Sequence, residues 1–247
     1  MSPAPLAERW LLEGAEASGL QLTREQISLF FRYRDLLRTA NRTYNLTALG
    51  SDEEIIIKHF LDSLSGRLLF HPQPGEAVLD LGPGGGFPSL PLALVDESFP
   101  LLLLEPRQHP ADFLEQLIAT FSLGKAIVVR QRSESFARGE GRGAFDWVLA
   151  RAVARLNVLL ELSLPLLRQD GHLLAWKGDQ IEEELAGAEY ALQELGGEVE
   201  AIQPLTLPHW GLQRNLVLVR KVRPTPERYP RRTGLPHKHP LEGHIFR

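Results

Sequence analysis

Hydrophobic and polar residues alternate in two different ways along the chain. Over residues 1–70 the apolar side chains recur every three or four positions, which is typical of amphipathic helices. Two capping boxes, Thr23-x-x-Gln26 and Ser51-x-x-Glu54, stand directly before such apolar series and indicate helix starts. A first helix is expected to end near Gly19, because glycine is common just beyond a helix. The first 70 residues are therefore predicted to be helical.

The pattern changes in the next segment, 71–222, to short apolar runs that alternate with helical stretches, which is the order of an α/β fold. The runs predicted as strands are 77–81, 101–105, 126–129, 145–150, 172–176, 199–203 and 215–219. Helices are expected to begin between 88 and 91 and to cover 112–123, 157–167 and 181–195. Fully apolar runs such as 101–104 indicate buried parallel strands.

A glycine cluster, Asp80-x-Gly-x-Gly-x-Gly-Phe87, follows the first predicted strand. Its glycines are Gly82, Gly84 and Gly86. Glycine permits positive φ and close approach of a ligand, and the next helix presents unpaired N–H groups. A P-loop would need Lys-Ser/Thr where Phe87-Pro88 stands, and a dinucleotide fingerprint would need glycine in place of Phe87. The Asp80 carboxylate favours a cationic ligand such as S-adenosylmethionine, although a plain glycine-rich surface loop is an equal alternative.

Polar residues also follow the carboxyl ends of later predicted strands. Glu105 lies 23 residues after Gly82, where an acid commonly binds ribose hydroxyls. Ser133-Glu134 follows the third strand, and Arg151 and Lys177 follow the fourth and fifth. In open α/β sheets this edge carries the ligand site, so five such positions together favour a site over solvated loops. Acids on one side and bases on the other suit a cofactor beside an anionic substrate.

Composition limits the classes of protein. The 247 residues include 43% hydrophobic residues and no cysteine, which excludes disulfides, thiolate nucleophiles and Cys-ligated zinc and suits a cytoplasmic protein. No apolar stretch approaches the ~18 residues of a membrane helix, and the N-terminus lacks the apolar core of a signal peptide. His59 and Asp62 share a helix face, but no third ligand accompanies them, so no metal site is expected.

Charge is distributed unevenly over the chain. The formal net charge is −4, yet residues 220–247 hold eight lysines and arginines against two glutamates. A basic tail on an acidic body indicates an anionic partner, or else a solvated tail that only keeps the protein soluble.

Seven motifs occur together in one order over residues 20–240. They are Tyr44-Asn45-Leu46-Thr47, His59-x-x-Asp62-Ser63, Asp80-x-Gly-x-Gly-x-Gly-Phe87-Pro88-x-x-Pro91, Glu105-Pro106-Arg107, Arg151-Ala152-Val153-Ala154, Lys177-Gly178 and Tyr229-Pro230-Arg231-Arg232-Thr233-Gly234-Leu235-Pro236. This combination resembles the ribosomal RNA small subunit methyltransferase G family, also called glucose-inhibited division protein B. Pro83 and Ser89 depart from its usual pattern, without removing a polar group that the chemistry needs.

The resemblance implies a class I S-adenosylmethionine-dependent methyltransferase fold, Rossmann-like with a mostly parallel seven-stranded sheet. A helical cap (1–70), a methyltransferase core (71–222) and a basic tail (223–247) would make up the chain. The implied reaction is methylation of a guanine N7 in 16S ribosomal RNA, free or in the small ribosomal subunit, by a cytoplasmic monomer without metal. Guanine N7 has a free lone pair at neutral pH, so alignment can replace a general base.

The resemblance also implies roles for single residues. The glycine loop with Asp80 and Phe87 would hold the cofactor, Glu105 its ribose, and Ser133 and Glu134 its adenine. The resemblance also places Arg151 beside the cofactor. The position of Arg151 and Lys177 at adjacent strand tips predicts that both are catalytic and contact RNA. Further RNA contacts are expected from Arg214, Arg231, Arg232 and Lys238.

Three alternatives remain open. A methyltransferase acting on a small molecule or a protein would share this core. A Rossmann oxidoreductase is disfavoured by Phe87, and a non-enzymatic RNA-binding assembly factor is disfavoured by the intact set of Asp80, glycines and Glu105.

Overall fold

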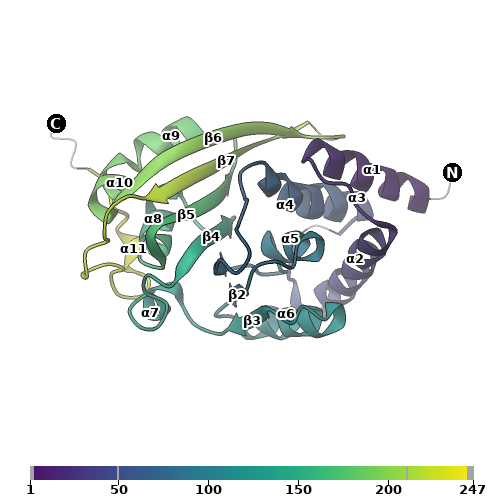
Figure 1. Cartoon of the computed structure of the whole chain (residues 1–247), viewed down its shortest axis with the longest axis horizontal. Helices are drawn as coiled ribbons and strands as arrows, with labels where there is room; N and C mark the ends of the chain where they lie inside the picture. The colour runs from purple at the N-terminus through teal and green to yellow at the C-terminus, as the bar shows by residue number, and fades with distance from the viewer. Residues whose placement is uncertain (1–2, 49, 210, 244–247) are drawn as a thin grey trace.

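Seven strands form one sheet through the middle of the molecule (Figure 1), in a computed structural model that describes residues 3–48, 50–209 and 211–243. The strands are β1 (Val78–Leu81), β2 (Leu101–Leu104), β3 (Ala126–Val129), β4 (Phe145–Arg151), β5 (Leu167–Lys177), β6 (Gly197–Leu207) and β7 (Leu212–Lys221). Their order is β3-β2-β1-β4-β5-β7-β6, with β1 to β5 parallel and β7 antiparallel to both its neighbours. The predicted α/β class with a mostly parallel seven-stranded sheet is confirmed.

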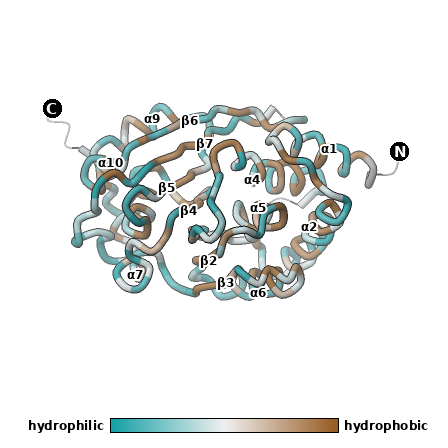
Figure 2. Tube along the Cα trace, in the orientation of Figure 1, coloured by the Kyte–Doolittle hydropathy of each residue, from teal (hydrophilic) through white to brown (hydrophobic). Residues whose placement is uncertain are grey.

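Helices cover both faces of the sheet because side chains along each strand alternate between two hydrophobic clusters. In β1, Val78 joins the cluster on one face, whereas Leu79 and Leu81 join the other. The first face carries α1 (Pro3–Ala17), α2 (Arg24–Tyr44), α5 (Ser89–Val95) and α6 (Gln108–Phe121). The second face carries α8 (Leu156–Ser163), α9 (Ile181–Ala186) and α10 (Glu189–Leu195). Figure 2 shows hydrophobic residues along the strands and hydrophilic residues on many outer helical turns.

The N-terminal helices and the sheet share one hydrophobic cluster. Phe30 and Tyr33 of α2 pack with Phe60, and Tyr33 and Phe60 also contact the ring of Phe87 beyond β1. Both predicted capping boxes are present, at Thr23 and at Ser51. The helical region is therefore packed directly against the loop that leaves β1.

The helix predicted after Ser51 is divided into four short pieces. They are α3 (Asp52–Glu54), a π-helix η1 (Ile55–Leu61), α4 (Asp62–Leu64) and a 3₁₀-helix η2 (Ser65–Leu68). Hydrophobic periodicity does not separate these helical forms over such short pieces, because the 3₁₀- and π-helical turns each differ from the α-helical turn by less than one residue. The π-helix η1, with its wider turn, contains His59 and ends directly before Asp62.

Other boundaries differ from the prediction for local reasons. Helix α6 begins before Pro110, which is tolerated in the first turn because its missing N–H would have no partner there. The same helix ends at Phe121, and Ser122 rather than Gly124 takes the left-handed conformation (φ 56°). The predicted helix 181–195 is interrupted near Gly187, and 133–136 forms a short helix, α7 (Ser133–Phe136), rather than a loop.

The chain reverses its direction of winding between β1 and β4. From β1 it builds outward through β2 and β3, then returns to place β4 on the other side of β1. In open α/β sheets, ligands bind beyond the carboxyl ends of strands at such a reversal. The glycine loop after β1 and Arg151 at the end of β4 lie at this position.

The C-terminal segment folds back beside α7 and α8 and contains the short helix α11 (Leu235–Lys238) (Figure 1). Positions 244–247 of the predicted basic tail lie outside the described residues. Among the residues described, no helix is long and apolar enough to cross a membrane. The same residues contain no group of three or more His, Cys, Asp or Glu side chains placed to hold a metal ion.

Replacement of Thr23 by alanine should weaken the start of α2. The Thr23 hydroxyl accepts a hydrogen bond from the amide of Gln26 (3.2 Å), so its loss should lower the free energy of unfolding by about 1 kcal/mol in chemical denaturation. The control is Thr39→Ala, in the same helix, where the hydroxyl only bonds back to the Asp35 carbonyl. Equal losses in the two variants would contradict the role of the cap.

Candidate active site

The glycine loop after β1 is shaped by positive φ angles at Gly82 (67°), Gly84 (56°) and Gly86 (99°). A Cβ at Gly86 would lie 2.2 Å from the hydroxyl of Tyr33, which is fully buried and donates to the Gly85 carbonyl (2.6 Å). A Cβ at Gly82 or Gly84 would approach no atom closer than 3.5 Å. The loop is thus held from below at Gly86, and its first two glycines leave space above it.

The buried carboxylate of Glu105, just after β2, joins this loop to the next strand. It accepts hydrogen bonds from the amides of Gly84 (3.1 Å) and Arg107 (3.0 Å). It also pairs with the guanidinium of Arg107, at 2.9 Å from Nε to Oε1. The Arg107 side chain is 65% exposed, so this ion pair lies at the surface rather than in the core.

A cavity of about 370 Å³ lies between the glycine loop, Glu105 and α7. Pockets of a few hundred Å³ are the size that small ligands occupy. Its lining includes Gly82, Glu105, Ser133, Glu134 and His237. The structure therefore brings the predicted loop glycine and the acids after β2 and β3 to one cavity.

Two of the predicted cavity residues also have structural partners. The Ser133 hydroxyl donates to the Leu162 carbonyl in α8 (2.6 Å), and the Glu134 carboxylate accepts from the Gly234 amide (2.8 Å). Their side chains thereby hold α7 against α8 and the C-terminal segment, in addition to bordering the cavity.

Asp80 lies beneath the loop rather than on the cavity wall. It is fully buried, and one carboxylate oxygen accepts from the Ser89 amide at the start of α5 (3.0 Å). The other oxygen has no hydrogen-bond partner among the described residues. Burial raises the pKa of Asp80 to about 7, an effect that hydrogen bonding by Ser89 partly offsets. A positive charge held above the loop would favour the ionised form of this buried carboxyl.

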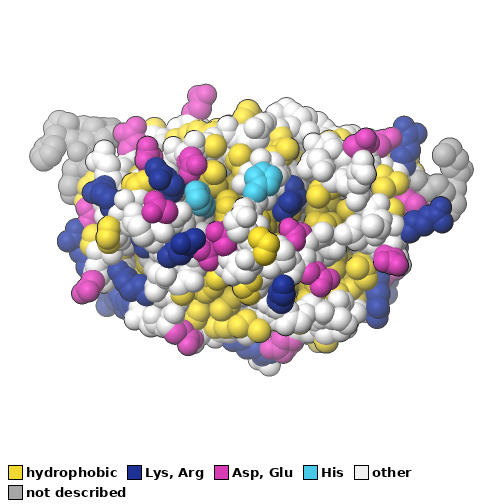
Figure 3. Space-filling model, viewed as in Figure 1, with side chains coloured by type: hydrophobic (Ala, Val, Ile, Leu, Met, Phe, Trp, Pro, Cys, Tyr) yellow, Lys and Arg dark blue, Asp and Glu magenta, His cyan; other side chains and the backbone are white. Residues whose placement is uncertain are grey.

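A second cavity, of about 390 Å³, adjoins the first at Ala152. Ala152 lines both cavities and has a φ of 57°, a conformation that is uncommon for residues other than glycine. The second cavity is lined by His59, Asp62 and four cations, namely Lys58, Arg151, Lys177 and Arg214. Figure 3 shows charged and histidine side chains gathered in the middle of one face of the molecule.

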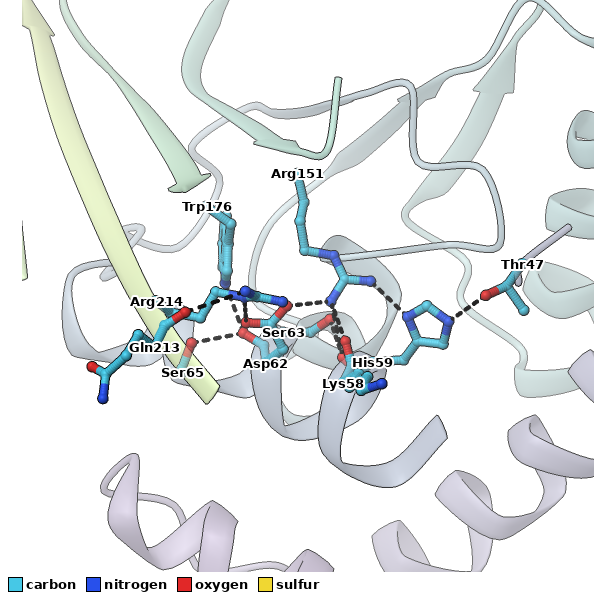
Figure 4. Close-up of polar contacts among 10 residues, drawn as sticks. All are labelled: Thr47, Lys58, His59, Asp62, Ser63, Ser65, Arg151, Trp176, Gln213 and Arg214. Atoms are coloured by element: carbon cyan, nitrogen blue, oxygen red, sulfur yellow. Dashed lines mark hydrogen bonds and ion pairs between the residues drawn. The ribbon is translucent and has the colours of Figure 1, made fainter. Parts of the chain in front are cut away.

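Asp62 holds two of these arginines at the second cavity (Figure 4). Its buried carboxylate receives Arg151 Nη1 at 2.9 Å on one oxygen and Arg214 Nε at 3.1 Å on the other. The indole of Trp176 donates to the Asp62 carbonyl (2.7 Å) and fixes the backbone there. Arginines from β4 and β7 thus meet at the Asp62 carboxylate, and a tryptophan from β5 bonds to its backbone.

His59 holds Arg151 from the other side. Arg151 Nη2 donates to His59 Nδ1 (3.0 Å), so Nε2 carries the ring proton and donates to Thr47 (2.8 Å). Burial, with the nearby charges of Arg151 and Lys58, lowers the pKa of His59 to about 2, so the ring is neutral. The ring stacks on Phe87 at 4.2 Å, and the Arg151 guanidinium lies over Phe87 at 5.1 Å.

Phe87 and Lys177 have contacts that the sequence did not indicate. Phe87 is stacked with His59 and Tyr33 and supports Arg151 instead of lining the first cavity. The Lys177 ammonium donates to the Ala154 carbonyl and to Glu184, both at 2.7 Å. Two of its three donors are thus used within the protein.

The basic residues of the tail point in different directions. Arg231 pairs with the buried carboxylate of Glu161, at 2.6 Å from Nη2 to Oε2, and so faces the core. Arg232 and Lys238 are exposed. The structure therefore brings together Arg151, Lys177 and Arg214, but it places Arg231 away from their cavity.

Several residues at the two cavities were not predicted from the sequence as site residues. The sequence shows His59 and Asp62 on one helix face and within a family motif, but it assigns neither of them a role in the site. Asp62 meets Arg151 and Arg214 from 89 and 152 positions away in the sequence, a distance that no local pattern spans. His237 directly follows the tail motif, which ends at Pro236, and the sequence itself gives no reason to place it at the site.

The fold that these elements define is that of a class I S-adenosylmethionine-dependent methyltransferase. It matches the structure of a SAM-dependent methyltransferase from Aquifex aeolicus with a TM-score of 0.52, covering 68% of this chain and 93% of the other at 14% identity. A transferase structure from Pyrococcus horikoshii matches with a TM-score of 0.51 at 18% identity, covering 64% of this chain and 63% of the other.

The family follows from sequence comparison. The model of the family described as rRNA small subunit methyltransferase G matches residues 26–217. A protein of Symbiobacterium thermophilum named ribosomal RNA small subunit methyltransferase G is 42% identical over 242 residues, covering 95% of this chain and 98% of its own length. One of the same name from Deinococcus radiodurans is 41% identical over 238 residues, covering 96% and 94%. The chain belongs to this family, which confirms the resemblance drawn from its motifs.

Replacement of Gly86 by alanine should destabilise the protein through the glycine loop. The new Cβ would meet the buried Tyr33 hydroxyl at a position with φ 99°, so the free energy of unfolding should fall by about 2–4 kcal/mol. Gly19→Ala is the matched control, because Gly19 has a φ of 75° and no atom of the described residues lies within 4 Å of a Cβ there. Its loss should be only about 1–2 kcal/mol. Similar losses in the two variants would contradict the close packing under Gly86.

Proposed function

We propose that this protein transfers the methyl group of S-adenosylmethionine to N7 of a guanine in 16S ribosomal RNA. The observation that carries the proposal is the pair of cavities that meet at Ala152. One is bounded by the glycine loop and Glu105, and the other is lined by cations. Membership in the methyltransferase G family supports both the reaction and the RNA substrate.

The first cavity fits S-adenosylmethionine. Glu105 would accept hydrogen bonds from the ribose hydroxyls once Arg107 turns outward. Gly82 and Gly84 leave room for the methionine part of the ligand. The unpaired oxygen of Asp80 beneath the loop favours the positive charge of the ligand. When bound, S-adenosylmethionine supplies an electrophilic methyl group on a sulfonium.

The second cavity fits an anionic nucleotide. Asp62 and His59 fix the guanidinium of Arg151 before any substrate arrives, so little side-chain entropy is lost when it binds. Arginine donors suit phosphate oxygens and the O6 atom of guanine. Arg151 and Arg214 would therefore orient the base with its N7 toward the opening beside Ala152, and Lys177 adds positive charge to the same cavity.

No residue is needed to remove a proton, because N7 of guanine has a free lone pair at neutral pH. His59 is neutral, but both its ring nitrogens are used, one by Arg151 and one by Thr47. Its role is thus to orient Arg151. The protein accelerates the reaction by aligning the two reactants and by the fixed charges around them.

We further propose that the protein acts as a cytoplasmic monomer on 16S RNA, either free or within the small ribosomal subunit. Residues 1–70 would form a helical cap, 71–222 the methyltransferase core and 223–247 the basic tail. A small-molecule or protein substrate would not require two fixed arginines at the second cavity.

Methylation should be observed directly. The purified protein is incubated with labelled S-adenosylmethionine and with unmodified 16S RNA or small subunits, and N7-methylguanine is mapped by chemical strand cleavage. Label should appear at one guanine in at least one of the two substrates. The absence of incorporation into both would reject the proposed function.

Replacement of Arg151 by alanine should impair methylation of that RNA. Because Arg151 is fixed in the second cavity, kcat/KM for RNA should fall by about 100-fold. The variant should still fold, since Asp62 keeps Arg214. The control is Arg155→Ala, whose exposed side chain pairs with Glu183 and does not line either cavity. Full activity in the Arg151 variant would refute its role.

A further inference from the structure

The C-terminal segment is tied to the core by contacts that a solvated tail would not make. Arg142, before β4, donates to the carbonyl oxygens of Tyr229 (2.7 Å) and Thr225 (2.9 Å). Arg138 donates to the Pro230 carbonyl (3.0 Å). Arginines of the core thus hold the backbone of the segment at these positions.

An ion pair between Arg231 and Glu161 adds a further attachment. The Glu161 side chain is 1% exposed and receives the Arg231 amide (2.8 Å) and its guanidinium (2.6 Å from Nη2). A buried, bidentate arginine–carboxylate pair is geometrically specific. The same Nη2 donates to the carbonyl of His239 (2.7 Å), so the pair also fixes the turn that follows α11.

These contacts place His237 at the first cavity. The Gly234 amide is bonded to Glu134 of α7, and His237 follows it by three residues in α11. Pro236 is buried beside it, whereas the His237 side chain is exposed and lines the cavity together with Glu105 and Ser133. The imidazole is therefore presented to the cavity from a fixed backbone.

The strand order shows which part of a bound cofactor would lie next to His237. The tips of β4, β1, β2 and β3 follow one another in that order, and neighbouring strands are about 4.8 Å apart. The second cavity lies at the β4 end, Glu105 follows β2, and α7 with Glu134 follows β3. A ligand with its reactive group near Ala152 and its ribose at Glu105 has its third part, the adenine, at α7 and His237.

We infer that the C-terminal segment forms the outer wall of the cofactor cavity and that His237 contacts the adenine of S-adenosylmethionine. This inference rests on the proposed function. An imidazole offers an aromatic face for stacking and ring nitrogens for hydrogen bonds to adenine. The segment, which its charge suggested as an RNA-binding tail, thereby serves cofactor binding.

The test measures binding of S-adenosylhomocysteine to the full-length protein by calorimetry, without RNA. His237→Ala should weaken binding by about 5- to 10-fold, as expected for loss of a stacked base contact. His239→Ala is the matched control, because His239 is an exposed histidine of the same segment that does not line the cavity. It should bind as the wild type does.

A second pair of variants tests whether the C-terminal segment forms the outer wall of the cofactor cavity. Arg231→Gln should weaken S-adenosylhomocysteine binding, and adding His237→Ala to it should cause less than the additive loss, because His237 would already be displaced. Thermal melting confirms that the variants are folded. Wild-type affinity in His237→Ala would overturn the inference, as would equal losses in His237→Ala and His239→Ala. Failure of the wild type itself to bind S-adenosylhomocysteine would instead refute the proposed function.

Discussion

The buried carboxylate of Asp62 is the interaction on which the arrangement of the substrate cavity depends. It is 2% exposed and forms ion pairs with two guanidinium groups, one from β4 and one from β7. A carboxylate in such surroundings is stable only while it is paired, and removal of its partners from a buried pair costs several kcal/mol, on the order of 3–5. The same pairing keeps Arg151 and Arg214 in fixed positions at the cavity. Local stability and readiness to bind an anion therefore have one physical origin.

Much of the fold could be predicted because it depends on regular patterns. Apolar runs mark buried strands, and parallel strands bring their carboxyl ends to a single edge. Gly82, Glu105, Arg151 and Lys177 could be expected at that edge for this reason alone. The capping boxes at Thr23 and Ser51 were readable because their bonds join residues only three positions apart.

The direction and the partners of side chains could not be predicted in the same way. The hydroxyl of Ser133 turns to Leu162, and the ammonium of Lys177 is shared with Glu184, because rotamers and packing decide these contacts. A count of charges suggests that Arg231 is a surface cation, whereas its guanidinium is paired with the buried carboxylate of Glu161. The π-helical turn at His59 was hidden because hydrophobic spacing is too coarse to detect it.

The bond from the Tyr33 hydroxyl to the Gly85 carbonyl has a consequence for the modularity of the protein. Tyr33 belongs to the N-terminal helices, yet it supports the glycine loop at the centre of the α/β sheet. Replacement of the helical region would therefore remove a contact that supports the glycine loop. A chimera of two relatives would keep this support only if the parent that supplies helix α2 has a tyrosine at the place of Tyr33.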